Sequence, residues 1–444
     1  MLDRPSPPTF TAALGWWLKL GFISFGGPAG QIATMHQELV ERRRWISEQR
    51  FLHALNFCML LPGPEAQQLT IYIGWLLHRT WGGVVAGVLF ILPGLALLIG
   101  LSYIYMAYGE INWVQGIFSG IKPAVVAVVA VATWRIGSRA LRNRLLWGFA
   151  VASFVAIFFF RLPFPLIVLI AAAAGAIGGK FAPEKFRLGG AHGGAQISFG
   201  PAVIDDDTPI PEHAVFSRSR LFLLILFVLA LGVVVFASLG VPILRDMAKF
   251  FTQAALLTFG GAYAVLPYVY QGAVETFGWL TPTQMIDGLA LGETTPGPLI
   301  MVVAFVGFVG AYTQQIFGAD STMLFFGGFA GAVVATVFTF LPSFLFVLSG
   351  APLIEATRGD LKFTAPLTGI TAAVVGVVAN LALFFAWHVL LPQATAQRPF
   401  AGSLDVIAAA IAVLAAIAMW RYQVSVVRVI AACALLGLGR SIIF

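Results

Sequence analysis

A few ionisable side chains stand within or beside otherwise apolar stretches of this sequence. Lys19 precedes a glycine pair, Glu65 follows one Pro-Gly-Pro motif, and Glu293 precedes another. A charge at the centre of a bilayer costs roughly 2.5–3.5 kcal/mol on insertion scales, so a retained charge is a functional candidate. Lys19 is placed to hold an anion and either glutamate to carry a proton. The alternatives are an ammonium that extends to the interface and a capping or pairing role for the glutamates. Lys122, near the start of its helix, is expected at the interface.

Glycine or proline interrupts four apolar regions of the chain. The regions and their interruptions are 12–40 at Ser24-Phe-Gly-Gly, 50–79 at Pro62-Gly-Pro, 247–276 at Thr258-Phe-Gly-Gly and 284–312 at Pro296-Gly-Pro. A proline inside a helix costs about 3 kcal/mol or more, so an unbroken helix through Pro-Gly-Pro is unfavourable. We therefore expect hairpins of half-helices with these motifs at their tips. A single continuous crossing is the alternative.

The interrupted helices predict a binding site for a small anion. The first turn of a helix has free N–H groups and a partial positive charge, and glycine lets the backbone approach an oxyanion closely. The expected site comprises the four motifs, Lys19 and neighbouring hydroxyls: Lys19, Ser24, Gly26, Gly27, Pro62, Gly63, Pro64, Thr258, Gly260, Gly261, Thr294, Thr295, Pro296, Gly297 and Pro298. Glu65 and Glu293 are the candidate coupling or proton-carrying groups. Close helix packing is the alternative explanation for a single glycine pair.

The same motifs indicate an internal duplication. At an offset of 234 residues Ser24 falls on Thr258, and the first Pro-Gly-Pro falls on the second. After an insertion of 15 residues near 313–323 the offset becomes 249, and Pro93 falls on Pro342. Shared glycine, proline and tryptophan at one offset are not expected by chance, even in a strongly apolar chain. The chain is therefore built from two related halves.

Composition places these halves in a membrane. The 444 residues are 59% hydrophobic and 10% charged, whereas soluble domains are about 45–50% apolar and about 25% charged. Further apolar runs suited to crossing a bilayer are 80–108, 113–138, 145–160, 163–180, 219–238, 323–350, 363–388, 405–420 and 423–443. We predict an all-α polytopic membrane protein, with no cleavable signal peptide at its start.

Charge in the loops predicts how the two halves are oriented. The loop 41–50 carries four arginines, whereas its repeat partner 275–284 carries no Lys or Arg. Because cytoplasmic loops are enriched in these residues, the two loops are expected on opposite sides of the membrane. The predicted fold is two inverted-topology repeats whose broken half-helix hairpins meet near the midplane. Its parts are a first membrane repeat 1–181, a disordered cytoplasmic linker 182–217, an unpaired inverting helix 218–240 and a second membrane repeat 241–444.

The motifs resemble those of the chromate ion transporter (CHR) family in its long-chain, two-half form. In the first half these are Phe25-Gly-Gly-Pro, Glu41-Arg-Arg-Arg-Trp-Ile-Ser and Leu61-Pro-Gly-Pro-Glu-Ala-Gln-Gln-Leu; in the second, Leu257-Thr-Phe-Gly-Gly-Ala, Trp279-Leu-Thr and Glu293-Thr-Thr-Pro-Gly-Pro. The resemblance covers nearly the whole chain apart from 182–217. It implies a secondary transporter of the inner (plasma) membrane that exports chromate and confers chromate resistance, with sulfate as the expected analogue.

Two other transport functions stay open at this point: a carrier for sulfate or another oxyanion, and an anion channel. An enzyme or a scaffold is disfavoured, because the sequence has no catalytic cluster and a scaffold needs no matched interruptions. The six histidines lack metal-ligand spacing, so no metal or other cofactor is expected. The net charge of +7 fits basic cytoplasmic loops rather than nucleic-acid binding. The expected partners are a small oxyanion and the lipid bilayer, and a homodimer stays open.

Overall fold

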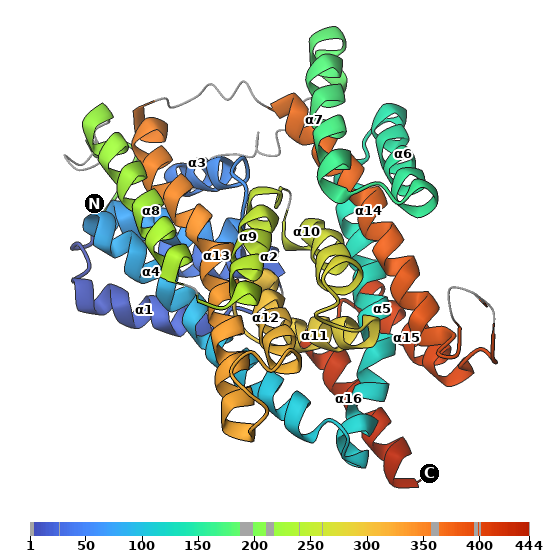
Figure 1. Ribbon diagram of the computed structural model, residues 1–444. Coiled ribbons are helices and arrows are strands. Elements are labelled where there is room, and N and C mark those ends of the chain that lie inside the picture. Colours follow the sequence, from blue (N-terminus) through green and yellow to red (C-terminus); the bar gives the residue numbers. More distant parts are fainter. Residues whose placement is uncertain are drawn as a thin grey trace.

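The computed structural model is helical along the predicted apolar runs (Figure 1). It describes residues 4–25, 27–186, 199–209, 217–238, 240–259, 261–356, 364–394, 398 and 401–443. Five helices within these ranges are long and apolar enough to cross a membrane, and shorter apolar helices accompany them. No strand is assigned in the described ranges. The protein is therefore an all-α polytopic membrane protein, as predicted.

The order of elements in the first half recurs in the second. The first series is α1 (Phe10–Ile23), α2 (Gly27–His36), the π-helix η1 (Gln37–Arg42), α3 (Glu48–Cys58), α4 (Glu65–Tyr108), α5 (Asn112–Ala140), α6 (Arg144–Phe160) and α7 (Phe164–Phe181). After η2 (Pro183–Lys185) and α8 (Arg218–Ser238) come α9 (Pro242–Leu256), α10 (Ala262–Tyr270), the π-helix η4 (Gln271–Thr276), α11 (Pro282–Thr294), η5 (Leu299–Met301), α12 (Val302–Thr313), α13 (Ser321–Ala356), α14 (Thr364–Leu390), α15 (Val406–Trp420) and α16 (Val426–Ile443). The two π-helices begin at Gln37 and Gln271, which the 234-residue offset superimposes.

Helix α4 consists of two arms that fold against each other. The chain leaves the helical conformation near Arg79, whose φ is +59°. The arms touch through glycine, since a Cβ added to Gly74 would lie 2.6 Å from the carbonyl oxygen of Gly82. Helices α12 and α13 make a similar contact, where a Cβ on Gly307 would lie 2.3 Å from the carbonyl oxygen of Gly331. Only glycine permits so close an approach of two backbones, so both halves join these helices in the same way.

Helices of each half pack on a long helix of the other half. Helices α5 and α14 lie against each other, α6 and α7 pack on α14, and α15 and α16 pack on α5 (Figure 1). Helix α13 packs on α4, α9 and α12. The largest hydrophobic cluster joins α5, α14 and the interrupted helices α9 to α12 of the second half. A second cluster encloses α1, α3 and the first arm of α4, together with the C-terminal part of α13.

Part of the segment between the two halves is docked on the first half. Ile204 forms a β-bridge with Ile46, and the N–H of Ser47 donates to the carbonyl oxygen of Ile204 at 3.0 Å. The Ile204 side chain is buried. Residues 199–209 of the predicted linker therefore have a defined position beside the 41–50 loop, while 187–198 and 210–216 lie outside the described residues.

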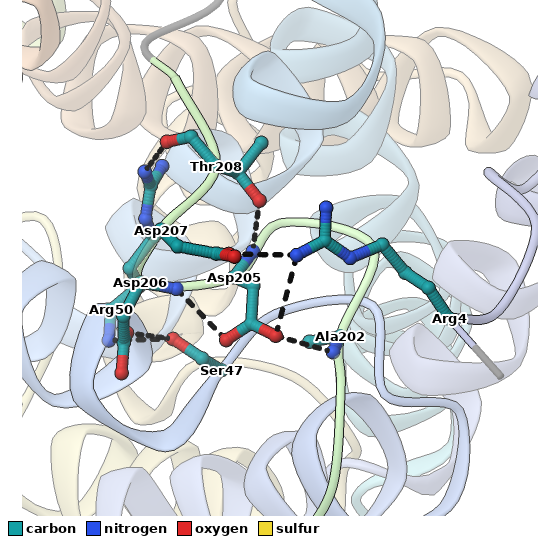
Figure 2. Close-up of polar contacts among 8 residues, drawn as sticks. All are labelled: Arg4, Ser47, Arg50, Ala202, Asp205, Asp206, Asp207 and Thr208. Atoms are coloured by element: carbon teal, nitrogen blue, oxygen red, sulfur yellow. Dashed lines mark hydrogen bonds and ion pairs between the residues drawn. The ribbon is translucent and has the colours of Figure 1, made fainter. Parts of the chain in front are cut away.

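Three consecutive aspartates of this segment contact the N-terminus and the 41–50 loop (Figure 2). Arg4 is 2.7 Å from Asp207 and 3.9 Å from Asp205, and the hydroxyl of Ser47 donates to Asp206 at 2.5 Å. Exposed ion pairs of this kind contribute at most about 1 kcal/mol each. These contacts contribute little stability, but they show that the N-terminus, the 41–50 loop and the docked segment share one face of the molecule.

Candidate functional site

Each of the four predicted interruptions ends one helix and begins another. In chain order, the pairs are α1 to α2, α3 to α4, α9 to α10, and α11 to η5 with α12. Four helical segments therefore start at the predicted motifs. Their first N–H groups have no partner inside their own helices, which is the property that the anion-site prediction requires.

One glycine in each interruption has a backbone conformation that other residues rarely adopt. The φ angles are +73° at Gly27, +126° at Gly63, +98° at Gly261 and +105° at Gly297. These conformations cost glycine little but cost an L-residue roughly 1–2 kcal/mol. Gly26 and Gly260, which also belong to the predicted site, lie outside the described residues.

The interruptions of the two halves contact each other in reciprocal pairs. The N–H of Gly63 donates to the carbonyl oxygen of Thr258 at 2.8 Å, and the N–H of Gly297 donates to that of Ser24 at 2.9 Å. The 234-residue offset exchanges one pair for the other. Contacts across a two-fold axis have this reciprocal form. Each Pro-Gly-Pro motif is thereby fixed to the glycine motif of the other half.

The long helices α4 and α13 pass directly beside these contacts. A Cβ on Gly94 of α4 would lie 2.5 Å from the carbonyl oxygen of Pro296, and a Cβ on Gly63 would lie 2.4 Å from Oγ of Ser343 on α13. Gly94 and Ser343 each follow the proline inside their helix and are related by the 249-residue offset. Small residues at these two positions let the long helices approach the Pro-Gly-Pro turns.

Most hydroxyls of the predicted site are bonded to their own helices. Thr258 donates to the carbonyl oxygen of Ala254 at 2.7 Å, and Thr294 and Thr295 donate to carbonyls of the preceding turn. Ser24 differs, because its Oγ is buried and has no hydrogen-bond partner among the described residues. Among the predicted hydroxyls of the described residues, that of Ser24 is therefore the one left to contact an anion, beside the backbone N–H groups at the helix starts.

Two glutamines absent from the sequence prediction hold the Pro-Gly-Pro turns. Nε2 of Gln31 donates to the carbonyl oxygen of Gly297 at 2.6 Å, and Nε2 of Gln68 donates to that of Pro62 at 2.8 Å. Both side chains are buried, and valine occupies both repeat-related positions in the second half. The available signals were a single amide in α2 at Gln31 and a pair of amides, Gln67 and Gln68, near the start of the apolar helix α4.

The structure places the three predicted ionisable residues in different surroundings. Lys19 lies on the exposed side of α1. Glu65 is the first residue of α4, where the helix start favours a carboxylate. Glu293 accepts a hydrogen bond of 2.5 Å from the hydroxyl of Tyr263, a residue that the sequence prediction did not include. Neither glutamate has a carboxylate at its repeat-related position.

Lys122, expected at the interface, also forms an ion pair with a buried carboxylate. Its Nζ lies 3.7 Å from Oδ2 of Asp287 on α11. The hydroxyl of Tyr105 donates to the same oxygen at 2.9 Å. Sequence reasoning missed this cluster because α4, α5 and α11 meet only in the folded chain. The signal was an aspartate within the apolar region 284–312.

Comparisons with known proteins agree with the two-half architecture. A family model described as "Chromate transporter" matches residues 12–176 and 245–438, one range in each half. The chain belongs to the chromate transporter family. Among its relatives is a chromate transport protein of Pseudomonas aeruginosa, 32% identical over 98% of this chain and 93% of that protein. No solved structure gives a significant match.

Two further relatives cover most of the chain. A chromate transport protein of Cupriavidus metallidurans is 28% identical over 89% of this chain and 90% of its own length. A probable chromate transport protein of Synechococcus elongatus is 29% identical over 82% of this chain and 81% of its own. The family is one of transporters, so this multi-pass membrane protein is a transporter and not an enzyme.

Proposed function

We propose that this transporter exports chromate across the inner membrane and so confers chromate resistance. The observation that carries the proposal is the reciprocal pairing of Gly63 with Thr258 and of Gly297 with Ser24. It joins the four helical segments in two pairs, and the free N–H groups and partial positive charge at helix starts suit an oxyanion. Inverted-repeat transporters bind anionic groups at half-helix starts near the midplane. The names of the relatives direct the proposal to chromate.

The direction of transport follows from the charge of the substrate. Moving one charge through 100 mV is worth about 2.3 kcal/mol, so a dianion leaving a negative interior gains about 4.6 kcal/mol per 100 mV. Export is therefore favourable without a coupling ion. Inward movement of the same dianion requires coupling, and Glu65 and Glu293 are the groups that we assign to carry a proton.

The proposed inverted topology makes a prediction that reporter fusions can test. A reporter fused just after 276–283 is expected on the outer side, because this loop lacks Lys and Arg. The matched fusion within 41–50, the arginine-rich repeat partner, is expected in the cytoplasm. A cytoplasmic signal from the 276–283 fusion would contradict the inverted arrangement.

Uptake of radiolabelled chromate into inside-out membrane vesicles tests the function directly. In this geometry uptake corresponds to export from the cell. We expect protein-dependent, saturable uptake that increases with a membrane potential and is inhibited by sulfate. Vesicles from cells without the protein are the control. No protein-dependent uptake, with or without a potential, would refute chromate export.

The same assay separates the alternative transport functions. A carrier whose main substrate is sulfate would take up labelled sulfate at lower concentrations than chromate. A channel would show flux that does not saturate with substrate and no competition between anions. Saturation with competition therefore supports a carrier, and the order of the two KM values identifies its better substrate.

A further inference from the structure

A polar cluster lies on α11, apart from the interruptions. Asp287 is six residues before Glu293 on this helix, which corresponds to about 9 Å along the helix axis. Its Oδ2 is 3.7 Å from Nζ of Lys122 on α5 and accepts a hydrogen bond of 2.9 Å from the hydroxyl of Tyr105 on α4. One side chain from each of three helices therefore meets between the Pro-Gly-Pro turn and the loop that precedes α11.

The two charged members of this cluster differ in accessibility. The side chain of Asp287 is 3% exposed, whereas that of Lys122 is 29% exposed. The second carboxylate oxygen, Oδ1, has no hydrogen-bond partner among the described residues. Among the described residues, Lys122 and Tyr105 are the polar groups that contact the other oxygen, Oδ2. The ammonium is thus the member of the pair that a molecule from outside the core can reach.

The shared fold of the two halves does not require this ion pair. The repeat-related positions of Lys122, Asp287 and Tyr105 are Thr371, His53 and Ile354, which form no such charge pair. Removing two charges from water costs several kcal/mol per ion, and apolar replacements of buried ion pairs are often neutral or stabilising. An ion pair between membrane segments, at positions whose repeat partners carry no such pair, therefore points to function.

We propose that Lys122, Asp287 and Tyr105 form a second binding site for the transported oxyanion. This inference rests on the proposed function. It places a second substrate site between the interruptions and the loop before α11, on the path that we propose for the substrate. When the site is empty, the Asp287 carboxylate neutralises Lys122. A tetrahedral dianion takes the place of that carboxylate as the partner of the ammonium, and the Tyr105 hydroxyl turns from Asp287 to the anion. Asp287 acts as a substitute anion that keeps the charge of Lys122 compensated between transport events.

This arrangement predicts opposite effects for the two charged residues. Lys122→Gln removes the binding cation, and we expect the KM for chromate to rise about tenfold, as for loss of one charge-assisted contact. Lys122→Arg keeps the charge and should stay close to wild type. Asp287→Asn removes the competing anion, so KM should fall about threefold or more, and the maximal rate should fall because release slows. Inside-out vesicles containing the full chain provide these values, normalised to the amount of folded protein.

A purely structural ion pair gives a different pattern. It predicts that both single variants lose folded protein and that the double variant Lys122→Gln/Asp287→Asn recovers wild-type kinetics. That result, or an unchanged KM in Asp287→Asn, would overturn the proposal. Wild-type vesicles that move sulfate but not chromate would refute the proposed substrate instead. The same opposite KM shifts, measured with labelled sulfate, would then decide the site.

Discussion

Replacing Gly261 by leucine is expected to abolish transport by a protein that still folds. The φ of Gly261 is +98°, and a Cβ built there meets no atom within 4 Å. The space before the start of α10 is therefore open, and a leucine side chain would occupy it. We expect the uptake rate to fall at least about tenfold. A tenfold fall corresponds to about 1.4 kcal/mol, and blocking the site removes more than one contact of that size. Gly27, the repeat partner at the start of α2, is equally open, and its leucine variant should behave alike.

Two comparisons separate blockage from backbone strain. Gly261→Ala adds only the strain of a positive φ, about 1–2 kcal/mol. It should therefore reduce the amount of folded protein and leave the KM of that protein nearly unchanged. Gly15→Leu is the matched control, because its Cβ also meets no atom within 4 Å but the residue lies inside α1 with ordinary helical geometry. Vesicle uptake, normalised by immunoblot, measures all three. A Gly261→Leu protein that transports at the wild-type rate would show that the interruptions do not bind substrate.

Local chemistry made the interruptions predictable from the sequence. Proline and glycine act within one or two residues of their own position, so Ser24-Phe-Gly-Gly and Pro62-Gly-Pro mark helix ends whatever the rest of the chain does. The duplication then placed two further interruptions in the second half. The structure adds the reciprocal hydrogen bonds between halves, which depend on packing and have no local sequence signal.

The polar partners could not be predicted in the same way. Glu293 and Tyr263 are 30 residues apart, and Lys122 and Asp287 lie in different halves. Which polar side chains meet depends on how helices rotate and cross, and an apolar chain offers many equivalent helix faces. The docked segment 199–209 is similar: its polar composition suggested a disordered linker, and the backbone bridge at Ile204 becomes available only once the 41–50 loop is in place.

Alanine at the two Pro-Gly-Pro glycines is expected to destabilise the protein unequally. Both residues have a positive φ, so each variant pays about 1–2 kcal/mol of backbone strain. At Gly63 the new Cβ would also lie 2.4 Å from Oγ of Ser343, whereas at Gly297 the nearest atoms are 3.8 Å away. Overpacking of a close contact typically costs a further 1–3 kcal/mol or so. The thermal unfolding midpoint of the detergent-solubilised protein should therefore fall more in Gly63→Ala than in Gly297→Ala.

Ser343 provides the test of this explanation. Its Oγ is buried and has no hydrogen-bond partner among the described residues, so Ser343→Ala alone should leave the unfolding midpoint nearly unchanged. In the Gly63→Ala background the same change removes the atom that the new Cβ would meet. The double variant should then recover to about the midpoint of Gly297→Ala, apart from the cost of displacing Nε2 of Gln68, which would lie 2.7 Å from the added Cβ. Equal losses at the two glycines would mean that α13 yields to the new methyl group. An extra loss at Gly63 that the double variant does not recover would mean that displacing Gln68, not the contact with Ser343, causes it. Recovery would show that the small side chain of α13 is what lets the interruptions of the two halves meet.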